Sequence, residues 1–165
     1  MSLFADDRYR WRETYFVLFH EADRPATEAL AEALQSLGGG YQVREVHTSE
    51  EGDFEALTLI APNDFSAMDI SYVGGDEVTE QVAELTRELR RSAATKHEKD
   101  RLEKLATCDA RFDVFHFQQL VADRFRNDDE DEDEFLDPGT LLLVLKRLAR
   151  LCHGIAVDPQ AGVLI

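Results

Sequence analysis

The chain has 165 residues, of which 44% are hydrophobic, and its formal net charge is −16. This size and composition predict one domain, covering residues 1–165, whose core forms without a metal ion or a disulfide. The acidity disfavours nucleic acids and anionic membranes as partners, because both require clustered Lys and Arg, and it suits a basic protein partner instead.

The first elements alternate strands with one helix. Residues 14–20 are apolar on both alternating faces, which is typical of a central strand. Pro25 then begins a helix whose apolar stripe ends at Leu37, before three glycines. Residues 41–48 and 54–61 are two further strand-like runs, joined by a hydrophilic connection of hairpin length.

The middle of the chain predicts a strand followed by two helices. Residues 67–73 alternate apolar and polar side chains, as a half-buried strand does. Asp76 can cap the helix that follows, whose apolar stripe consists of Val78, Val82, Leu85 and Leu89. Thr95 and Glu98 have the spacing of a capping box and predict the start of a second, shorter helix.

The last third predicts a strand, a helix and a hairpin. Residues 111–117 form an aromatic strand, and residues 118–126 fit either its continuation or a short helix. Asp137 and Pro138 begin a leucine-rich helix that Gly154 ends. The closing hairpin pairs residues 155–157 with residues 163–165, through a turn that contains Pro and Gly.

This order of elements indicates an α+β domain. Short hairpin-connected strands interspersed with helices favour an antiparallel or mixed sheet with its helices packed on one face. The N-terminal part has the layout of a ferredoxin-like split βαβ unit. No segment of about 20 to 50 residues repeats, so a solenoid is not indicated.

The most unusual local feature is DDEDEDE at residues 128–134, seven acidic side chains in a row. Its alternating carboxylates resemble a calcium loop, but Glu134 stands where an EF-hand needs Gly, and Thr140 stands where it needs Glu. Dense blocks of like charge remain solvated. We therefore expect an acidic, mobile loop at residues 127–134 and no calcium site.

The histidines are the candidates for acid–base or ligand-binding chemistry, because imidazole titrates near neutral pH. His20 follows the first strand, and His116 lies between Phe115 and Phe117 in an otherwise apolar strand. The two approach each other if their strands are neighbours; alternatively, His116 faces solvent or makes a buried hydrogen bond. With Asp69, they are the candidate ligand-binding residues.

Other site chemistry lacks the required spacing. Cys108 and Cys152 belong to no zinc-ligand array, and the leucines around Cys152 favour a core thiol. Gly74 to Asp76 connects a strand to a helix, as phosphate-binding loops do, but has no Lys. We expect no metal and no cofactor.

The sequence also predicts a cellular compartment. The longest apolar run, Leu141 to Leu145, is far shorter than the ~18 residues that span a bilayer. The N-terminal residues have neither the basic region nor the apolar segment of a secretory signal. A cytoplasmic location follows, in which Cys108 and Cys152 are reduced rather than paired.

A leucine-rich helix that runs into a strand and an Asp-Pro-Gln-x-Gly turn occupies the end of the chain, with the turn completed at Gly162. This ending resembles that of a family of bacterial proteins of unknown function. The resemblance covers about the last fifth of the chain and implies a bacterial origin and an α+β fold. It implies no activity.

Three functional hypotheses follow. The leading one is a cytoplasmic, non-enzymatic binding or regulatory protein, plausible as a homodimer, that uses an apolar sheet face or the aromatic residues Phe4, Tyr9 and Trp11. The second is an acidic inhibitor or immunity-type protein that binds a basic partner through charge complementarity. The third is a small enzyme or ligand-binding domain with a pocket near His116.

Overall fold

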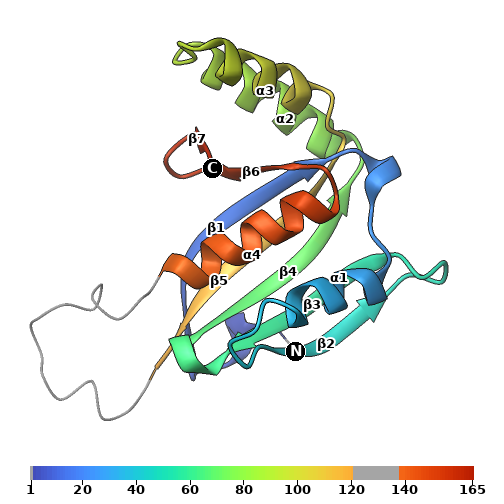
Figure 1. The fold of residues 1–165 in the computed structure, drawn as a ribbon, viewed down its shortest axis with the longest axis vertical. Coiled ribbons are helices and arrows are strands. Elements are labelled where there is room, and N and C mark those ends of the chain that lie inside the picture. Colours follow the sequence, from blue (N-terminus) through green and yellow to red (C-terminus); the bar gives the residue numbers. More distant parts are fainter. Residues whose placement is uncertain (1, 121–137) are drawn as a thin grey trace, which may run out of the picture.

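The computed structural model describes residues 2–120 and 138–165. Within these residues, seven strands form one antiparallel sheet in the order β2-β3-β4-β5-β1-β6-β7, accompanied by four α helices (Figure 1). The strands are β1 (Tyr9–Phe19), β2 (Gln42–Thr48), β3 (Phe54–Ala61), β4 (Ser66–Gly74), β5 (Ala110–Gln119), β6 (Ile155–Asp158) and β7 (Val163–Leu164). The helices are α1 (Thr27–Gln35), α2 (Asp76–Arg90), α3 (Lys96–Ala106) and α4 (Pro138–Leu151), and a short 3-10 helix, η1 (Leu3–Ala5), precedes β1.

The α+β class is confirmed, and the individual elements follow the sequence patterns closely. The capping box at the start of α3 is present, with Thr95 accepting from the Glu98 N–H and Glu98 accepting from the Thr95 N–H. Strand β1 begins at Tyr9, earlier than residue 14, and β5 continues through Gln119. The predicted loop at 127–134, the Asp137 cap and the end of the 118–126 segment lie outside the described residues.

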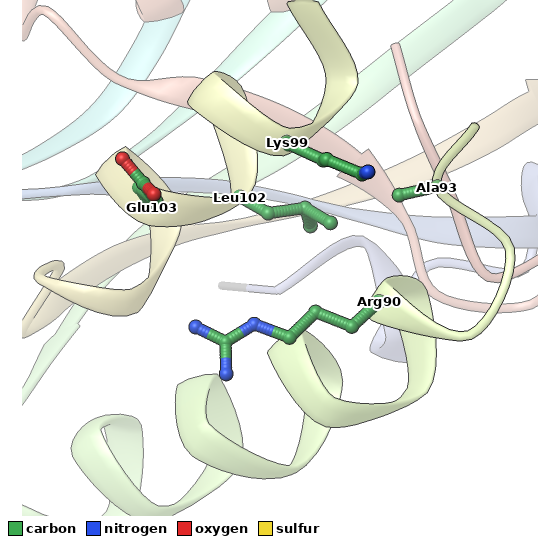
Figure 2. A pocket seen from close by; sticks show the side chains of 5 residues that line it. All are labelled: Arg90, Ala93, Lys99, Leu102 and Glu103. Carbon is green, nitrogen blue, oxygen red and sulfur yellow. The ribbon is translucent and has the colours of Figure 1, made fainter. Parts of the chain in front are cut away.

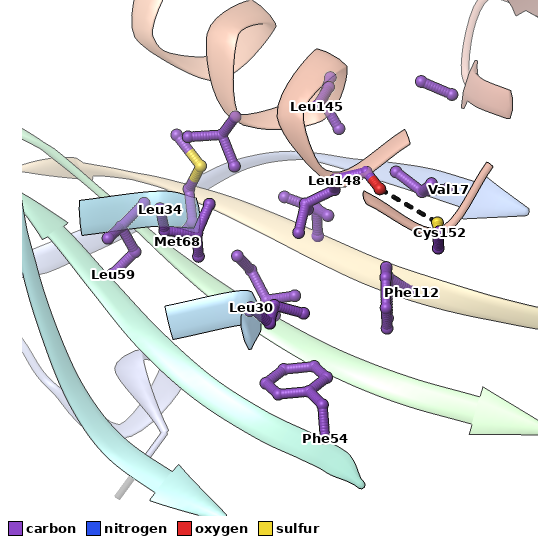
Figure 3. Close-up of a cluster of buried hydrophobic side chains, with 14 of the residues drawn as sticks. Val17, Leu30, Leu34, Phe54, Leu59, Met68, Phe112, Leu145, Leu148 and Cys152 are labelled. Atoms are coloured by element: carbon purple, nitrogen blue, oxygen red, sulfur yellow. Dashed lines mark hydrogen bonds between the residues drawn. The ribbon is translucent and has the colours of Figure 1, made fainter. Parts of the chain in front are cut away.

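One face of the sheet is covered by α1 and α4. Leu30 and Leu34 of α1 and Leu145 and Leu148 of α4 pack on apolar side chains of the central strands, among them Phe112 of β5 (Figure 3). All of these side chains are buried. Burial of a Leu or Phe side chain stabilises a fold by about 1.5–3 kcal/mol, so this cluster is the principal source of stability.

The opposite face carries α2 and α3. Val17 pairs with Phe112, whereas the next residue, Leu18, pairs with Arg111 and Ile155 and therefore points to the other side of the sheet. Leu18 and Ile155 contact the buried stripe of α2. The expectation of helices on one face therefore holds for α1 and α4 only.

The N-terminal part is larger than a ferredoxin-like unit. Strands β1 and β2 run parallel to each other, but β5, β4 and β3 lie between them. A split βαβ unit of the ferredoxin type has one strand in that place. The sheet order could not be foreseen from the sequence, because β5 enters the sheet between strands that precede it by many residues.

Candidate binding surfaces

His116 lies on β5, on the face that α1 and α4 cover, and is only 2% exposed. Its Nδ1 atom has no hydrogen-bond partner, and the nearest carboxylate oxygen, Oε1 of Glu13, lies 3.6 Å away. Burial lowers the pKa of His116, and the Glu13 carboxylate opposes that effect. The imidazole is therefore held in its neutral form, next to an acidic side chain that is itself partly exposed.

Asp69 lies on the opposite face of the sheet. Its neighbour Met68 pairs with His116, and successive residues of a strand alternate between faces. The Asp69 carboxylate is 8% exposed and accepts hydrogen bonds from the Leu3 N–H at 2.9 Å, the Ser2 hydroxyl at 2.9 Å and the Thr58 hydroxyl at 2.6 Å. The bonds from Leu3 and Ser2 fix the N-terminal segment on the sheet, and the bond from Thr58 joins Asp69 to β3.

His20 follows the end of β1, where its Nε2 atom lies 3.1 Å from the Thr107 hydroxyl. Strands β1 and β5 are neighbours, as the sequence allowed, but Glu13 is the residue of β1 that pairs with His116. His20 is seven residues beyond Glu13 and therefore about 24 Å further along the ladder, at ~3.4 Å per residue. The structure does not bring His20, Asp69 and His116 together.

Aromatic side chains gather on the face that carries Asp69, at the end of the sheet near η1. Phe4 packs edge-to-face on Phe115 and Phe117, with ring centroids 5.4 and 4.8 Å apart. Trp11 is the ladder partner of Phe117, and Tyr9 packs in the same cluster. We call Phe4, Tyr9, Trp11 and Phe115 the aromatic patch; Phe4 is 60% exposed and Trp11 46%.

A groove of about 330 Å³ begins beside this patch and extends across β4, β3 and β2. Phe4 and Phe115 form one end of it, and Asp69, Thr58 and His47 lie along it. The groove thus combines aromatic ring edges with a buried carboxylate. This combination can accommodate an apolar or cationic side chain better than an anionic one.

A second hollow lies between α2 and α3 (Figure 2). These helices lie at the opposite end of the molecule from η1, which carries Phe4 (Figure 1). It has a volume of about 350 Å³ and is lined by Arg90, Ala93, Lys99, Leu102 and Glu103. Leu102 is buried and forms the apolar floor. We call this hollow the interhelical cleft.

The two cysteines are free and buried, in agreement with the sequence. Burial raises the pKa of Cys108 to about 11 and that of Cys152 to about 12, so neither thiol is a ready nucleophile at neutral pH. In the part of the chain that the structure describes, no three His, Cys, Asp or Glu side chains gather as metal ligands do. None of the described helices is long and apolar enough to cross a membrane.

Sequence reasoning identified the aromatic residues of the N-terminal segment but not the interhelical cleft. The signal for the cleft was present, because seven of the 18 Lys and Arg residues lie between residues 87 and 104. No protein-family model matches the chain, and neither the curated proteins nor the solved structures contain a match. The surfaces described above therefore supply the grounds for a proposed function.

Proposed function

We propose that the chain is a non-enzymatic binding protein that recognises a basic protein through the aromatic patch. The exposure of Phe4 and Trp11 in one aromatic cluster carries the proposal, because contiguous exposed apolar patches, unlike single exposed residues, mark interaction sites. Trp and Tyr are also the residues that most often dominate the energy of protein interfaces.

The patch is held in place before any partner arrives. Asp69 binds the Leu3 N–H, which fixes the residue next to Phe4. The Phe4 ring then rests on Phe115 and Phe117, and the Trp11 indole N–H donates to the Thr14 hydroxyl at 3.2 Å. A partner that binds this surface therefore loses little affinity to the ordering of these side chains.

Charge favours a basic partner. A net charge of −16 accelerates association with a positively charged protein and repels an acidic one. The Asp69 carboxylate that lines the groove beside Phe4 adds negative potential there, although its oxygens already accept hydrogen bonds from Leu3, Ser2 and Thr58. A homodimer through the same patch stays a prediction of the sequence, but it would bring two chains of charge −16 together, which makes the basic partner the better fit.

The arrangement favours binding over catalysis. His20, Asp69 and His116 lie in three separate places, so no acid–base pair is formed among them. The inhibitor-type hypothesis agrees with this proposal, since an acidic inhibitor also binds a basic protein. The buried free cysteines support the cytoplasm as the proposed compartment, because thiols remain reduced there.

A capture experiment tests the proposal. The immobilised chain is expected to retain a basic protein that elutes as NaCl is raised, and the purified pair should form a complex of defined stoichiometry. The double substitution Phe4→Ser, Trp11→Ser should weaken that complex about tenfold or more, because it removes two aromatic contacts. The measurement is the dissociation constant by titration calorimetry.

The matched control is Leu142→Ser, Leu143→Ser, which removes two exposed apolar side chains from α4 instead. This variant should bind like the wild type. Capture that is insensitive to salt, or that fails equally in both double variants, would contradict the proposal. Urea unfolding of each variant establishes that any loss of binding is not a loss of fold.

A further inference from the structure

The end of the α2–α3 hairpin has the opposite charge from the rest of the chain. Residues 87–104 contain seven Lys or Arg and four Asp or Glu, a net charge of +3, which leaves −19 for the other residues of a chain of −16. We call residues 87–104 the basic tip. It projects beyond the sheet, on the end of the molecule away from η1 (Figure 1).

Helix electrostatics explain only part of the basic tip. Arg87 and Arg90 lie in the last turn of α2, where the helix dipole favours cations. Lys96 and Lys99 lie at the start of α3, where the dipole disfavours them. The helix dipole therefore does not account for these two Lys side chains, of which only Lys99 lines the interhelical cleft.

The interhelical cleft places two of these cations around an apolar floor. Arg90 comes from α2 and Lys99 from α3, and Leu102 lies between them (Figure 2). The side chains of Arg90 and Lys99 form no ion pair or hydrogen bond with the described residues, and both residues are exposed. In Figure 2 the two side chains extend in opposite directions along the cleft.

We propose that the interhelical cleft binds an acidic peptide segment of another protein. Two cations that point to opposite ends of the cleft can each meet a carboxylate, while an apolar side chain between those carboxylates packs on Ala93, which is only partly buried beside Leu102. A single small anion would reach only one of the two cations. Glu103 at one end of the cleft also disfavours a compact, highly charged anion.

This site is independent of the aromatic patch. The patch lies near η1 and fits a basic partner, whereas the cleft lies on the basic tip and fits an acidic one. Because the two surfaces lie at different ends of the molecule, the chain can contact two proteins of opposite charge. A failure of the peptide test would leave the proposed function untouched, since no residue is shared.

The test uses the full chain and a labelled peptide, Glu-Glu-Leu-Glu-Glu, in fluorescence anisotropy at low and at physiological ionic strength. We expect saturable binding that weakens with salt. The double substitution Arg90→Gln, Lys99→Gln should raise the dissociation constant about tenfold, the effect of two exposed charge contacts. The peptide Gln-Gln-Leu-Gln-Gln should not bind.

The control variant Arg91→Gln, Lys96→Gln removes the same charge from the same hairpin but alters no residue of the cleft. It should retain most of the affinity. Equal losses in the two double variants would show that only the overall charge of the tip matters and would overturn the cleft as the site. Absence of binding at low salt, or equally tight competition by free phosphate, would overturn the acidic peptide as the ligand.

Discussion

At the scale of single residues, the candidate ligand-binding residue Asp69 binds the N-terminal segment of its own chain. Its carboxylate joins the N-terminal segment to the sheet through Leu3 and Ser2, residues that are more than sixty positions away in the chain. No local pattern predicts such a contact. Asp69 therefore contributes to the aromatic patch by positioning Phe4, although the sequence identified it as a candidate ligand-binding residue on a half-buried strand.

The buried His116 predicts a pH-dependent stability. Burial keeps its folded-state pKa below the usual value of about 6.5, so the unfolded chain binds more protons than the folded chain as the pH falls below ~6.5. The free energy of unfolding should therefore decrease as the pH falls from about 7.5 to 5.5, by at most about 1.4 kcal/mol, because this range extends only about one pH unit below the unfolded pKa. Urea denaturation across this range measures it.

The matched variant for this prediction is His116→Gln, which cannot titrate, and its pH dependence should be shallower than that of the wild type. Glu13 and Arg12 are the charged groups that act on His116, in opposite directions. Glu13→Gln should steepen the dependence, because it removes the group that favours the protonated imidazole. If the free energy of unfolding of the wild type and that of His116→Gln change equally with pH, His116 is not the group responsible for the dependence.

At the scale of elements, hydrophobic periodicity predicted the helices and most strand boundaries, and the capping box predicted the start of α3. The predicted Asp76 cap was wrong, because Asp76 is the first residue of α2 and Gly75 stands at the N-cap position without a side-chain hydrogen bond. The start of β1 at Tyr9 was missed. Residues 9–13 alternate aromatic and charged side chains, which suit an exposed strand end but lack the continuous apolar run that predicted the strand at residues 14–20. The packing of α2 and α3 on the second face was also missed. A helix stripe shows that a face is buried, but it does not show against which side of a sheet.

Gly154 lies at the junction between α4 and β6, where there is no room for a side chain. A Cβ atom at this position would lie 2.5 Å from the backbone oxygen of Leu18 and 3.0 Å from the Cys152 sulfur. The substitution Gly154→Ala therefore forces α4 or β6 away from β1, and it should lower the free energy of unfolding by about 1–3 kcal/mol. Chemical denaturation measures the change.

Gly38 is the appropriate comparison, because its φ of +81° is unfavourable for alanine while nothing lies within 4 Å of a Cβ atom. Gly38→Ala reports the cost of the backbone conformation alone, roughly 1 kcal/mol. Gly154→Ala should cost more than Gly38→Ala. The reverse order would mean that the α4–β6 junction relaxes easily.

At the scale of the whole molecule, composition predicted the sign of the surface charge but not its distribution. The net charge of −16 does not reveal the basic tip, because a sum over the chain does not record where each charge lies. The aromatic patch was foreseen in part, since Phe4, Tyr9 and Trp11 lie close together in the sequence. Phe115 joins them only because β5 pairs with β1.

The same charge distribution predicts how salt acts on stability. Glu80, Glu84 and Glu88 follow one another at a spacing of four on the exposed side of α2, where like charges repel. Raising NaCl from about 10 to about 300 mM screens such repulsion and should increase the free energy of unfolding in urea by on the order of 1 kcal/mol. The variant Glu80→Gln, Glu84→Gln, Glu88→Gln should be more stable at low salt and respond less to NaCl. If salt raises the free energy of unfolding of the variant and the wild type equally, the repulsion lies elsewhere on the surface. If salt lowers the free energy of unfolding of the wild type, attractive ion pairs outweigh the excess of negative charge.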